Sequence, residues 1–216
     1  MHYRLIPNSF HFENLSLFNT SYRGLHMKNN TYENDVRILG GKFKGKLLPV
    51  LDGEGLRPTP SRVRETIFSW IRNSIDNAKV LDLFAGSGAL GFEAYSRGAA
   101  KVTLIELDKD NSSNLKEIAK RMSTEDIHVI NDDALHFLDN TNTVFDIVFI
   151  DPPYKLNIYE DVLKKLLDKN LINDNSLIYV EMRNGSNKIV PGYEIIKEEN
   201  AGQSKYSLWT KSKLLF

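Results

Sequence analysis

Residues 80–106 constrain the fold of this chain more than any other part of the sequence. Their first five residues form a short apolar strand, which runs into the glycine-rich turn Gly86-x-Gly88-x-x-Gly91. A helical pattern follows and ends at Gly98, and residues 101–105 form the next apolar strand. A strand, a helix and a strand within about thirty residues form a βαβ unit, which implies a right-handed crossover and a parallel sheet. The sequence therefore predicts an α/β fold with helices on both faces of a mostly parallel sheet.

The glycine-rich turn predicts a nucleotide-type ligand. Glycines at a first βα turn let the backbone approach a ligand closely, and the following helix N-terminus adds unpaired N–H donors. Three glycines at this spacing are equally the dinucleotide fingerprint, so NAD is a competing ligand. Asp82 lies in the strand before the glycines, where it would repel a pyrophosphate but suits an amino-acid-like ligand. Glu106, after the second strand, can accept two hydrogen bonds from a ribose diol.

A third strand end is also acidic. Asp132 and Asp133 follow residues 128–131, where an adenine amine can be received, although either aspartate also suits a helix N-cap. S-adenosylmethionine carries an ammonium, a sulfonium, a ribose diol and an adenine but no phosphate, so acidic strand ends favour it over a dinucleotide. The predicted cofactor-binding residues are Asp82, Phe84, Ala85, Gly86, Ser87, Gly88, Gly91, Glu106, Leu107, Asp133 and Ala134.

The stretch Asp151-Pro152-Pro153-Tyr154 directly follows an apolar strand over residues 144–150. Proline fixes its own φ and pushes the preceding residue into an extended conformation, so Asp151 and Pro152 are both held extended. One carboxylate and one carbonyl then form a rigid acceptor pair at a strand end, which suits an exocyclic amino group with its two N–H donors. Asp-Pro alone also favours an exposed turn. The predicted catalytic residues are Asp151, Pro152, Pro153 and Tyr154.

A basic segment precedes the βαβ unit. Residues 36–41 and 46–50 are expected to form a hairpin, and a helix is expected to follow with Thr59 and Pro60 as its N-cap and first-turn residue. Local basic residues outnumber acidic ones, as on a face that meets phosphates, although charge alone is equally typical of a solvated surface. The residues of this segment predicted to contact nucleic-acid phosphates are Arg37, Lys42, Lys44, Lys46, Arg57, Thr59, Arg62 and Arg64.

Composition limits the remaining possibilities. The chain has 216 residues, 41% of them hydrophobic, which suffices for one α/β domain and a small appendage. It has no cysteine, which excludes disulfides and thiolate metal sites, and its five histidines show no metal-ligand spacing. No apolar run approaches membrane-spanning length. A formal net charge of zero argues against a uniformly basic nucleic-acid binder. We expect a cytoplasmic monomer that uses no metal and does not bind membranes.

The chain is expected to divide into three parts. Residues 1–26 have no clean hydrophobic period and no apolar core of a secretory signal, so they are interpreted as a disordered or dispensable extension. Residues 27–75 form the basic hairpin and helix. Residues 76–216 form the main domain, which also includes a covering helix, a fifth strand and a closing hairpin after Tyr154.

Four motifs occur together and in order, namely Arg37-Ile38-x-Gly40-Gly41, Arg57-Pro58-Thr59-x-x-Arg62-Val63-Arg64-Glu65, Asp82-Leu83-Phe84-Ala85-Gly86-Ser87-Gly88-Ala89-Leu90-Gly91 and Asp151-Pro152-Pro153-Tyr154. From about residue 36 to its end, the chain resembles the RsmD family, bacterial enzymes that methylate N2 of one guanine in small-subunit (16S) ribosomal RNA. The combination is far more specific than any single motif. Ser61 stands where many members have Asp, and residues 1–26 have no recognised counterpart.

The resemblance implies a seven-stranded Rossmann-like methyltransferase sheet whose last strand is antiparallel, with S-adenosylmethionine as methyl donor and structured RNA on an assembling small subunit as substrate. It implies that Asp82 and the glycine-rich turn hold the methionine end, Glu106 the ribose, and Asp133 with Ala134 the adenine. The guanine must leave its stack for an in-line transfer. Tyr154 is then expected to stack on the base, while Asp151 and the Pro152 carbonyl accept from its amine.

Three other functions compete with this interpretation. A methyltransferase acting on DNA adenine or cytosine, or on a protein glutamine amide, keeps the chemistry and often carries Asn in place of Asp151; the basic hairpin with residues 57–65 favours ribosomal RNA. An NAD-dependent oxidoreductase leaves Asp82 and the Asp-Pro-Pro-Tyr stretch unexplained. A non-catalytic RNA-binding module would use the basic patch as its one site.

Overall fold

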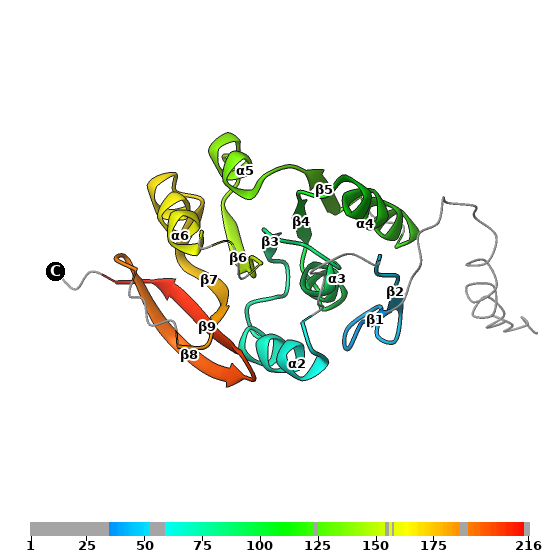
Figure 1. Ribbon diagram of the computed structural model, residues 1–216, viewed down its shortest axis with the longest axis horizontal. Helices are drawn as coiled ribbons and strands as arrows, with labels where there is room; N and C mark the ends of the chain where they lie inside the picture. The colour runs from blue at the N-terminus through cyan, green and yellow to red at the C-terminus, as the bar shows by residue number, and fades with distance from the viewer. Residues whose placement is uncertain are drawn as a thin grey trace, which may run out of the picture. The chain divides into compact units, whose positions relative to one another are not determined.

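Strands and helices alternate along most of the chain, and the computed structural model arranges the strands into one large sheet and a small hairpin (Figure 1). The structure describes residues 35–51, 59–122, 125–153, 156, 158–185 and 190–213. The predicted extension over residues 1–26 and the predicted site residues Arg57 and Tyr154 lie outside the described residues.

The large sheet has the strand order β5-β4-β3-β6-β7-β9-β8. Its strands are β3 (Lys79–Asp82), β4 (Lys101–Glu106), β5 (Ile127–Asn131), β6 (Phe145–Ile150), β7 (Ile172–Arg183), β8 (Tyr193–Ala201) and β9 (Ser204–Lys211). The strands from β5 to β7 are parallel, whereas β9 is antiparallel to both of its neighbours, β7 and β8. The predicted seven-stranded, mostly parallel sheet with an antiparallel last strand is confirmed.

Helices cover both faces of this sheet, because the side chains of each buried strand alternate between two hydrophobic clusters. In β6, Ile147 and Phe149 pack into one cluster, and Val148 and Ile150 into the other. The first cluster includes residues of α2 (Ser61–Trp70), α3 (Ala89–Ser96) and α4 (Lys109–Arg121). The second includes residues of α5 (Ala134–Asn140) and α6 (Tyr159–Asp168), which lie next to each other in Figure 1.

The hairpin and α2 pack into the same cluster as α3 and α4. Strands β1 (Val36–Arg37) and β2 (Leu47–Leu48) pair antiparallel, over fewer residues than predicted, and α2 contributes Val63, Ile67 and Phe68 to the cluster. The N-cap of α2 is Pro60, which makes no side-chain cap, so the prediction of Thr59 as N-cap is wrong by one residue. The hairpin and α2 thus share a core with the sheet.

Helix α4 has no counterpart in the elements predicted from the sequence. It presents few large apolar residues, although the buried Leu115, Ile118 and Ala119 follow the helical period. Its caps carry a further signal. The Asp108 carboxylate accepts a hydrogen bond from the Asn111 N–H at 2.8 Å. Basic residues lie in the last turn, where their positive charge interacts favourably with the negative end of the helix dipole.

Candidate active site

The order of strands in the sheet reverses direction at the boundary between β3 and β6, and two acidic residues lie at this boundary. From β3 the sheet grows outward through β4 and β5, and β6 then returns to the other side of β3. Ligands of open α/β sheets bind outside the carboxyl ends of the strands at such a switch point. Asp82 ends β3, Asp151 directly follows β6, and the two strands pair with Asp82 opposite Phe149. The structure therefore brings Asp82 and Asp151, both predicted from the sequence, to one place.

Four carboxylates from neighbouring strands gather at this edge of the sheet: Glu106 from β4, Asp82 from β3, Asp151 after β6 and Glu181 from β7. Burial, with a further contribution from Glu106, raises the pKa of Asp82 to about 7. Burial, then Glu181 and Asp82, raises the pKa of Asp151 well above its ordinary value. Negative groups held together away from water are typical of a site that receives a cation or a hydrogen-bond donor.

Glu181 was not singled out from the sequence. Its carboxylate accepts a hydrogen bond from the Tyr179 hydroxyl at 2.8 Å. Neither residue belongs to a glycine-rich or proline-containing motif. The available signal is one acidic residue inside the otherwise apolar run 177–182, because a carboxylate in a buried strand needs a partner or a task.

The glycine-rich turn packs closely around Asp82. The Gly91 N–H donates to Asp82 Oδ2 at 3.0 Å. A Cβ on Gly91 would lie 2.1 Å from Leu104 Cδ2, so any larger residue would force the Leu104 side chain to move where α3 packs on β4. Gly88 is the N-cap of α3 with φ of 73°, and a Cβ there would lie 2.5 Å from the Phe92 ring. The other predicted turn residues connect β3 to α3 at the switch point; they are Phe84, Ala85, Gly86 and Ser87.

Glu106 is held by three donors beside this turn. Its Oε2 accepts from the Gly86 N–H at 2.9 Å and from Asn111 Nδ2 at 3.0 Å, and its Oε1 accepts from the Asp108 N–H at 2.8 Å. Asn111 Nδ2 also donates to the Gly86 carbonyl at 2.6 Å, so one amide ties the turn to the carboxylate. Sequence reasoning missed Asn111. Leu107, the next residue after Glu106, is 68% exposed.

Asp133 caps α5. Its Oδ1 accepts from the N–H groups of Leu135 at 2.9 Å and His136 at 3.1 Å, which confirms the capping interpretation for this residue. Asp132 instead contacts His136 Nδ1 at 2.8 Å, and this hydrogen bond raises the pKa of His136. Ala134, the first residue of α5, is buried.

Asp151 accepts a hydrogen bond from outside the sheet. The Thr59 hydroxyl, in the segment before α2, donates to Asp151 Oδ2 at 3.4 Å. Of the two prolines that follow Asp151, Pro152 is buried and Pro153 is exposed. The Pro153 carbonyl accepts from the Leu156 N–H at 2.8 Å. Thr59 was predicted to contact RNA, and the structure places its hydroxyl on the predicted catalytic carboxylate.

A basic surface remains around the hairpin. We define it as Arg37, Lys42, Lys44, Lys46 and Arg62; all are exposed except Lys46, which is half-buried. Lys46 Nζ donates to the Arg121 carbonyl at 3.2 Å, and burial lowers the pKa of Lys46.

The loop of the hairpin is fixed to the end of α3 by Ser96. The Ser96 hydroxyl donates to the Gly40 carbonyl at 2.5 Å and accepts from the Phe43 N–H at 2.9 Å. The Ser96 carbonyl accepts from the Lys42 N–H at 2.7 Å. A Cβ on Gly41, whose φ is 76°, would lie 1.7 Å from that carbonyl oxygen, so the close contact requires glycine. The backbone at Lys42 is therefore fixed by contacts within the fold.

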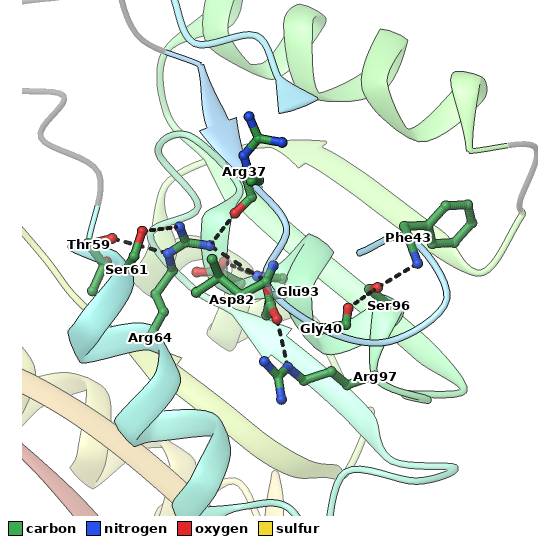
Figure 2. A network of polar contacts seen from close by, with 12 residues as sticks. Arg37, Gly40, Phe43, Thr59, Ser61, Arg64, Asp82, Glu93, Ser96 and Arg97 are labelled. Carbon is green, nitrogen blue, oxygen red and sulfur yellow. Dashed lines mark hydrogen bonds and ion pairs between the residues drawn. The ribbon is translucent and has the colours of Figure 1, made fainter. Parts of the chain in front are cut away.

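Arg64 does not belong to the basic surface, and its prediction as an RNA contact is wrong. It is 2% exposed and lies inside the fold, where its Nη1 is 3.5 Å from Glu93 Oε2 (Figure 2). Its guanidinium also donates to the carbonyls of Thr59 and Arg37 and to the Ser61 hydroxyl. Charge counting along the sequence cannot separate a buried arginine from an exposed one, and the lone Glu93 in an otherwise apolar helix was the missed signal.

Among the described helices, none combines the length and apolar character that crossing a membrane requires. The described residues also contain no group of three or more His, Cys, Asp or Glu side chains arranged to hold a metal ion.

Comparisons with known proteins agree with this fold. The family model described as Conserved hypothetical protein 95 matches residues 36–210. The chain is 43% identical over 180 residues to the ribosomal RNA small subunit methyltransferase D of Haemophilus influenzae, covering 81% of this chain and 93% of that protein. It is 41% identical over 185 residues to the protein of the same name from Escherichia coli, covering 85% and 93%.

Solved structures give the same result. A putative methyltransferase from Escherichia coli superposes with a TM-score of 0.76 at 39% identity, covering 82% of this chain and 98% of that one. A putative methylase from Haemophilus influenzae gives 0.73 at 39% identity, covering 83% and 100%. Because the family model spans most of the chain and the relatives match over nearly their whole lengths, the chain belongs to the Conserved hypothetical protein 95 family, which is the RsmD family of ribosomal RNA methyltransferases.

Proposed function

We propose that this protein transfers a methyl group from S-adenosylmethionine to the exocyclic N2 amine of one guanine in the 16S ribosomal RNA of the small subunit. The observation that carries the proposal is the placement of Asp82 and Asp151 side by side at the switch point, in a chain of this family. The relatives named as small-subunit ribosomal RNA methyltransferases support the choice of RNA as substrate.

The residues present fit S-adenosylmethionine by the chemistry of their donor set. Asp82 is buried, with a pKa raised to about 7, and a nearby positive charge would favour its ionised form. The glycine-rich turn and the start of α3 present backbone rather than side chains beside it. Bound there, the cofactor supplies a methyl group on a positively charged sulfur, which an amine nitrogen displaces in line. We assign Asp82 and the turn Gly86–Gly91 to its methionine end.

The remaining cofactor residues suit a nucleoside. Glu106 already accepts three hydrogen bonds, and a carboxylate has about four acceptor positions, so about one position remains for a ribose hydroxyl. Exposed Leu107 offers an apolar surface to a base, and Asp133 with Ala134 lies at the next strand end for an adenine amine. Asn111 holds both Glu106 and the turn, and we assign it a positioning role at the ribose site.

Asp151 acts on the nucleophile. Its carboxylate and the Pro152 carbonyl accept the two N–H groups of the guanine amine, which draws the nitrogen lone pair out of ring conjugation and toward the methyl group. After transfer the nitrogen is acidic, and a carboxyl group whose pKa is raised by burial can take the proton near neutral pH. Tyr154, outside the described residues, keeps its proposed role of stacking on the flipped base. The basic surface is proposed to contact RNA phosphates, on a cytoplasmic small subunit and with the protein as a monomer.

The reaction itself gives the direct test. Small ribosomal subunits from a bacterium that lacks this modification would be incubated with the protein and S-adenosylmethionine carrying a labelled methyl group. We expect one labelled guanine, methylated at N2, together with S-adenosylhomocysteine binding in calorimetry. Label on an adenine, a cytosine or a protein amide would reject the acceptor, and NADH binding without S-adenosylhomocysteine binding would reject the reaction class.

Removing two lysines of the basic surface is expected to weaken substrate binding alone. Lys42→Ala with Lys44→Ala should lower affinity for small subunits about tenfold at moderate salt and flatten its salt dependence, because fewer counterions are released from RNA. S-adenosylhomocysteine affinity should not change. The matched control is Lys79→Ala with Lys101→Ala, two exposed lysines at the amino ends of β3 and β4, away from the site. Equal losses in both double variants, measured by filter binding across a salt series, would contradict the assignment of this surface.

A further inference from the structure

The contact between Thr59 and Asp151 joins two segments that are distant in the sequence. Thr59 precedes α2 and Asp151 follows β6, and the hydroxyl donates to Asp151 Oδ2 at 3.4 Å, near the long end of the range for a hydrogen bond. The regular hydrogen bonds of α2 do not fix Thr59, because α2 begins two residues later and has Pro60 as its N-cap. Something else must hold Thr59 in position.

Arg64 holds it. One turn into α2, Arg64 reaches back with Nε to donate to the Thr59 carbonyl at 3.2 Å, and its Nη2 donates to the Ser61 hydroxyl at 3.3 Å. Its Nη1 donates to the Arg37 carbonyl at 3.0 Å, at the end of β1. The Arg64 side chain lies between these groups in Figure 2. Because the side chain is almost wholly buried and uses all three nitrogens, it fixes the backbone of Thr59 to the hairpin.

Glu93 in turn fixes Arg64. Its side chain is fully buried in α3, with Oε2 3.5 Å from Arg64 Nη1 and Oε1 2.6 Å from Arg97 Nε. Glu93 Oε2 also accepts from the Leu39 N–H at 2.7 Å, just after β1. The contacts therefore run without a gap from the helix that follows the glycine-rich turn, through Glu93 and Arg64, to Thr59 and the carboxylate of Asp151.

We propose that Thr59 is a positioning residue for Asp151, and that the buried Arg64–Glu93 pair sets where the Thr59 hydroxyl stands. The inference rests on the proposed function, in which Asp151 receives the amine of the substrate. By occupying Oδ2, the hydroxyl holds the carboxylate in one orientation and keeps Oδ1 for the amine. A threonine assigned by its sequence motif to RNA contact thus serves the reacting group.

The electrostatics around Asp151 show why a neutral donor matters at this position. The titratable groups that face Asp151 are Glu181 and Tyr179 from β7 and Asp82 from β3. Burial and the two carboxylates raise the pKa of Asp151, whereas the hydrogen bond from Thr59 lowers it. The hydroxyl therefore favours the ionised form of Asp151, which is the form that accepts from an amine.

A pair of substitutions separates this role from a general structural one. Thr59→Val removes the hydroxyl at nearly constant volume, and Thr59→Ser keeps it. With labelled S-adenosylmethionine and unmodified small subunits, we expect Thr59→Val to lower kcat about tenfold or more, since a hydrogen bond to a charged group is lost. KM and S-adenosylhomocysteine affinity should stay within about twofold to threefold, and Thr59→Ser should restore kcat. Thr66→Val, the same change inside α2, serves as the matched control.

The pH profile is the more specific readout. Because Thr59 lowers the pKa of Asp151, losing its hydroxyl should move the acidic limb of kcat to higher pH, and Thr59→Ser should move it back. A carbon NMR titration of the Asp151 carboxyl group reports the same upward shift in folded protein without turnover. It therefore also covers the case in which Thr59→Val is too poorly active to assay.

An unchanged limb, an unchanged carboxyl titration or equal losses in the valine and serine variants would overturn the positioning role. Absence of methyl transfer by the unsubstituted protein would instead overturn the proposed function.

Discussion

Replacing Asp151 by alanine is expected to lower the rate of methyl transfer by at least about 100-fold, while S-adenosylhomocysteine affinity stays within a few-fold. A positioned general base contributes about 10²–10⁴-fold, and Asp151 is also proposed to orient the amine. Single-turnover transfer to small subunits measures the first quantity, and calorimetry measures the second. Asp161→Ala, an exposed aspartate at the start of α6, is the matched control. A loss of cofactor affinity in Asp151→Ala as large as the loss of rate would place this carboxylate in the cofactor site.

The same variant has an expected signature in stability. The pKa of Asp151 is raised in the folded state, so the stability that this group contributes is present below its ordinary pKa and is lost as the pH rises through the raised value. Above that value, ionised Asp151 beside Asp82 and Glu181 destabilises the fold. Asp151→Ala should therefore unfold at a urea concentration no lower than that of the unsubstituted protein at mildly alkaline pH. A variant that loses activity without losing stability is typical of the replacement of a functional residue.

Replacing Glu93 by alanine is expected to destabilise the protein by about 3–5 kcal/mol. The substitution leaves the buried guanidinium of Arg64 without its carboxylate and removes the acceptor of the Leu39 N–H, and breaking a buried pair from one side costs about this much. Urea unfolding at neutral pH gives the free energy of unfolding directly.

A second salt bridge supplies the control for this measurement. Glu117 pairs with Lys120 on the solvent-facing side of α4, with the two side chains 44% and 76% exposed, and Glu117→Ala should change stability little. Glu93→Gln keeps an acceptor for Leu39 and should fall between the two. If Glu93→Ala and Glu117→Ala cost the same, the Arg64–Glu93 pair does not hold the hairpin and α2 onto α3.

The strand ends could be predicted from the sequence, because each one is marked locally. Asp82 precedes a glycine-rich turn and Asp151 precedes two prolines, so their positions at the carboxyl edge followed from the order of strands and helices alone. Thr59 and Arg64 lie in an equally clear motif, yet their partners Asp151 and Glu93 are supplied by β6 and α3. No local pattern reports a contact made across the fold, which is why both residues were assigned to an RNA surface.

Helix α4 and Asn111 were missed for a different reason. The helix is mostly polar, and its local marks are a narrow apolar face, with caps at Asp108 and in its last turn. Asn111 then matters because the first turn of α4 lies against Gly86 and Glu106, a proximity that depends on the pairing of β4 with β3. A polar residue in a first helical turn is ordinarily interpreted as solvated, and here the fold buries Asn111 and gives it two partners.

The position of β9 within the sheet has a consequence for how the chain folds during synthesis. In the described sheet β9 lies between β7 and β8, two strands that emerge earlier, and β8 pairs with β9 alone. Until β9 has been made, the long free edge of β7 is open to other chains, and β8 has nothing to pair with. Unpaired edges of this kind invite aggregation, and β9 removes both of them at once by pairing with β7 on one side and β8 on the other.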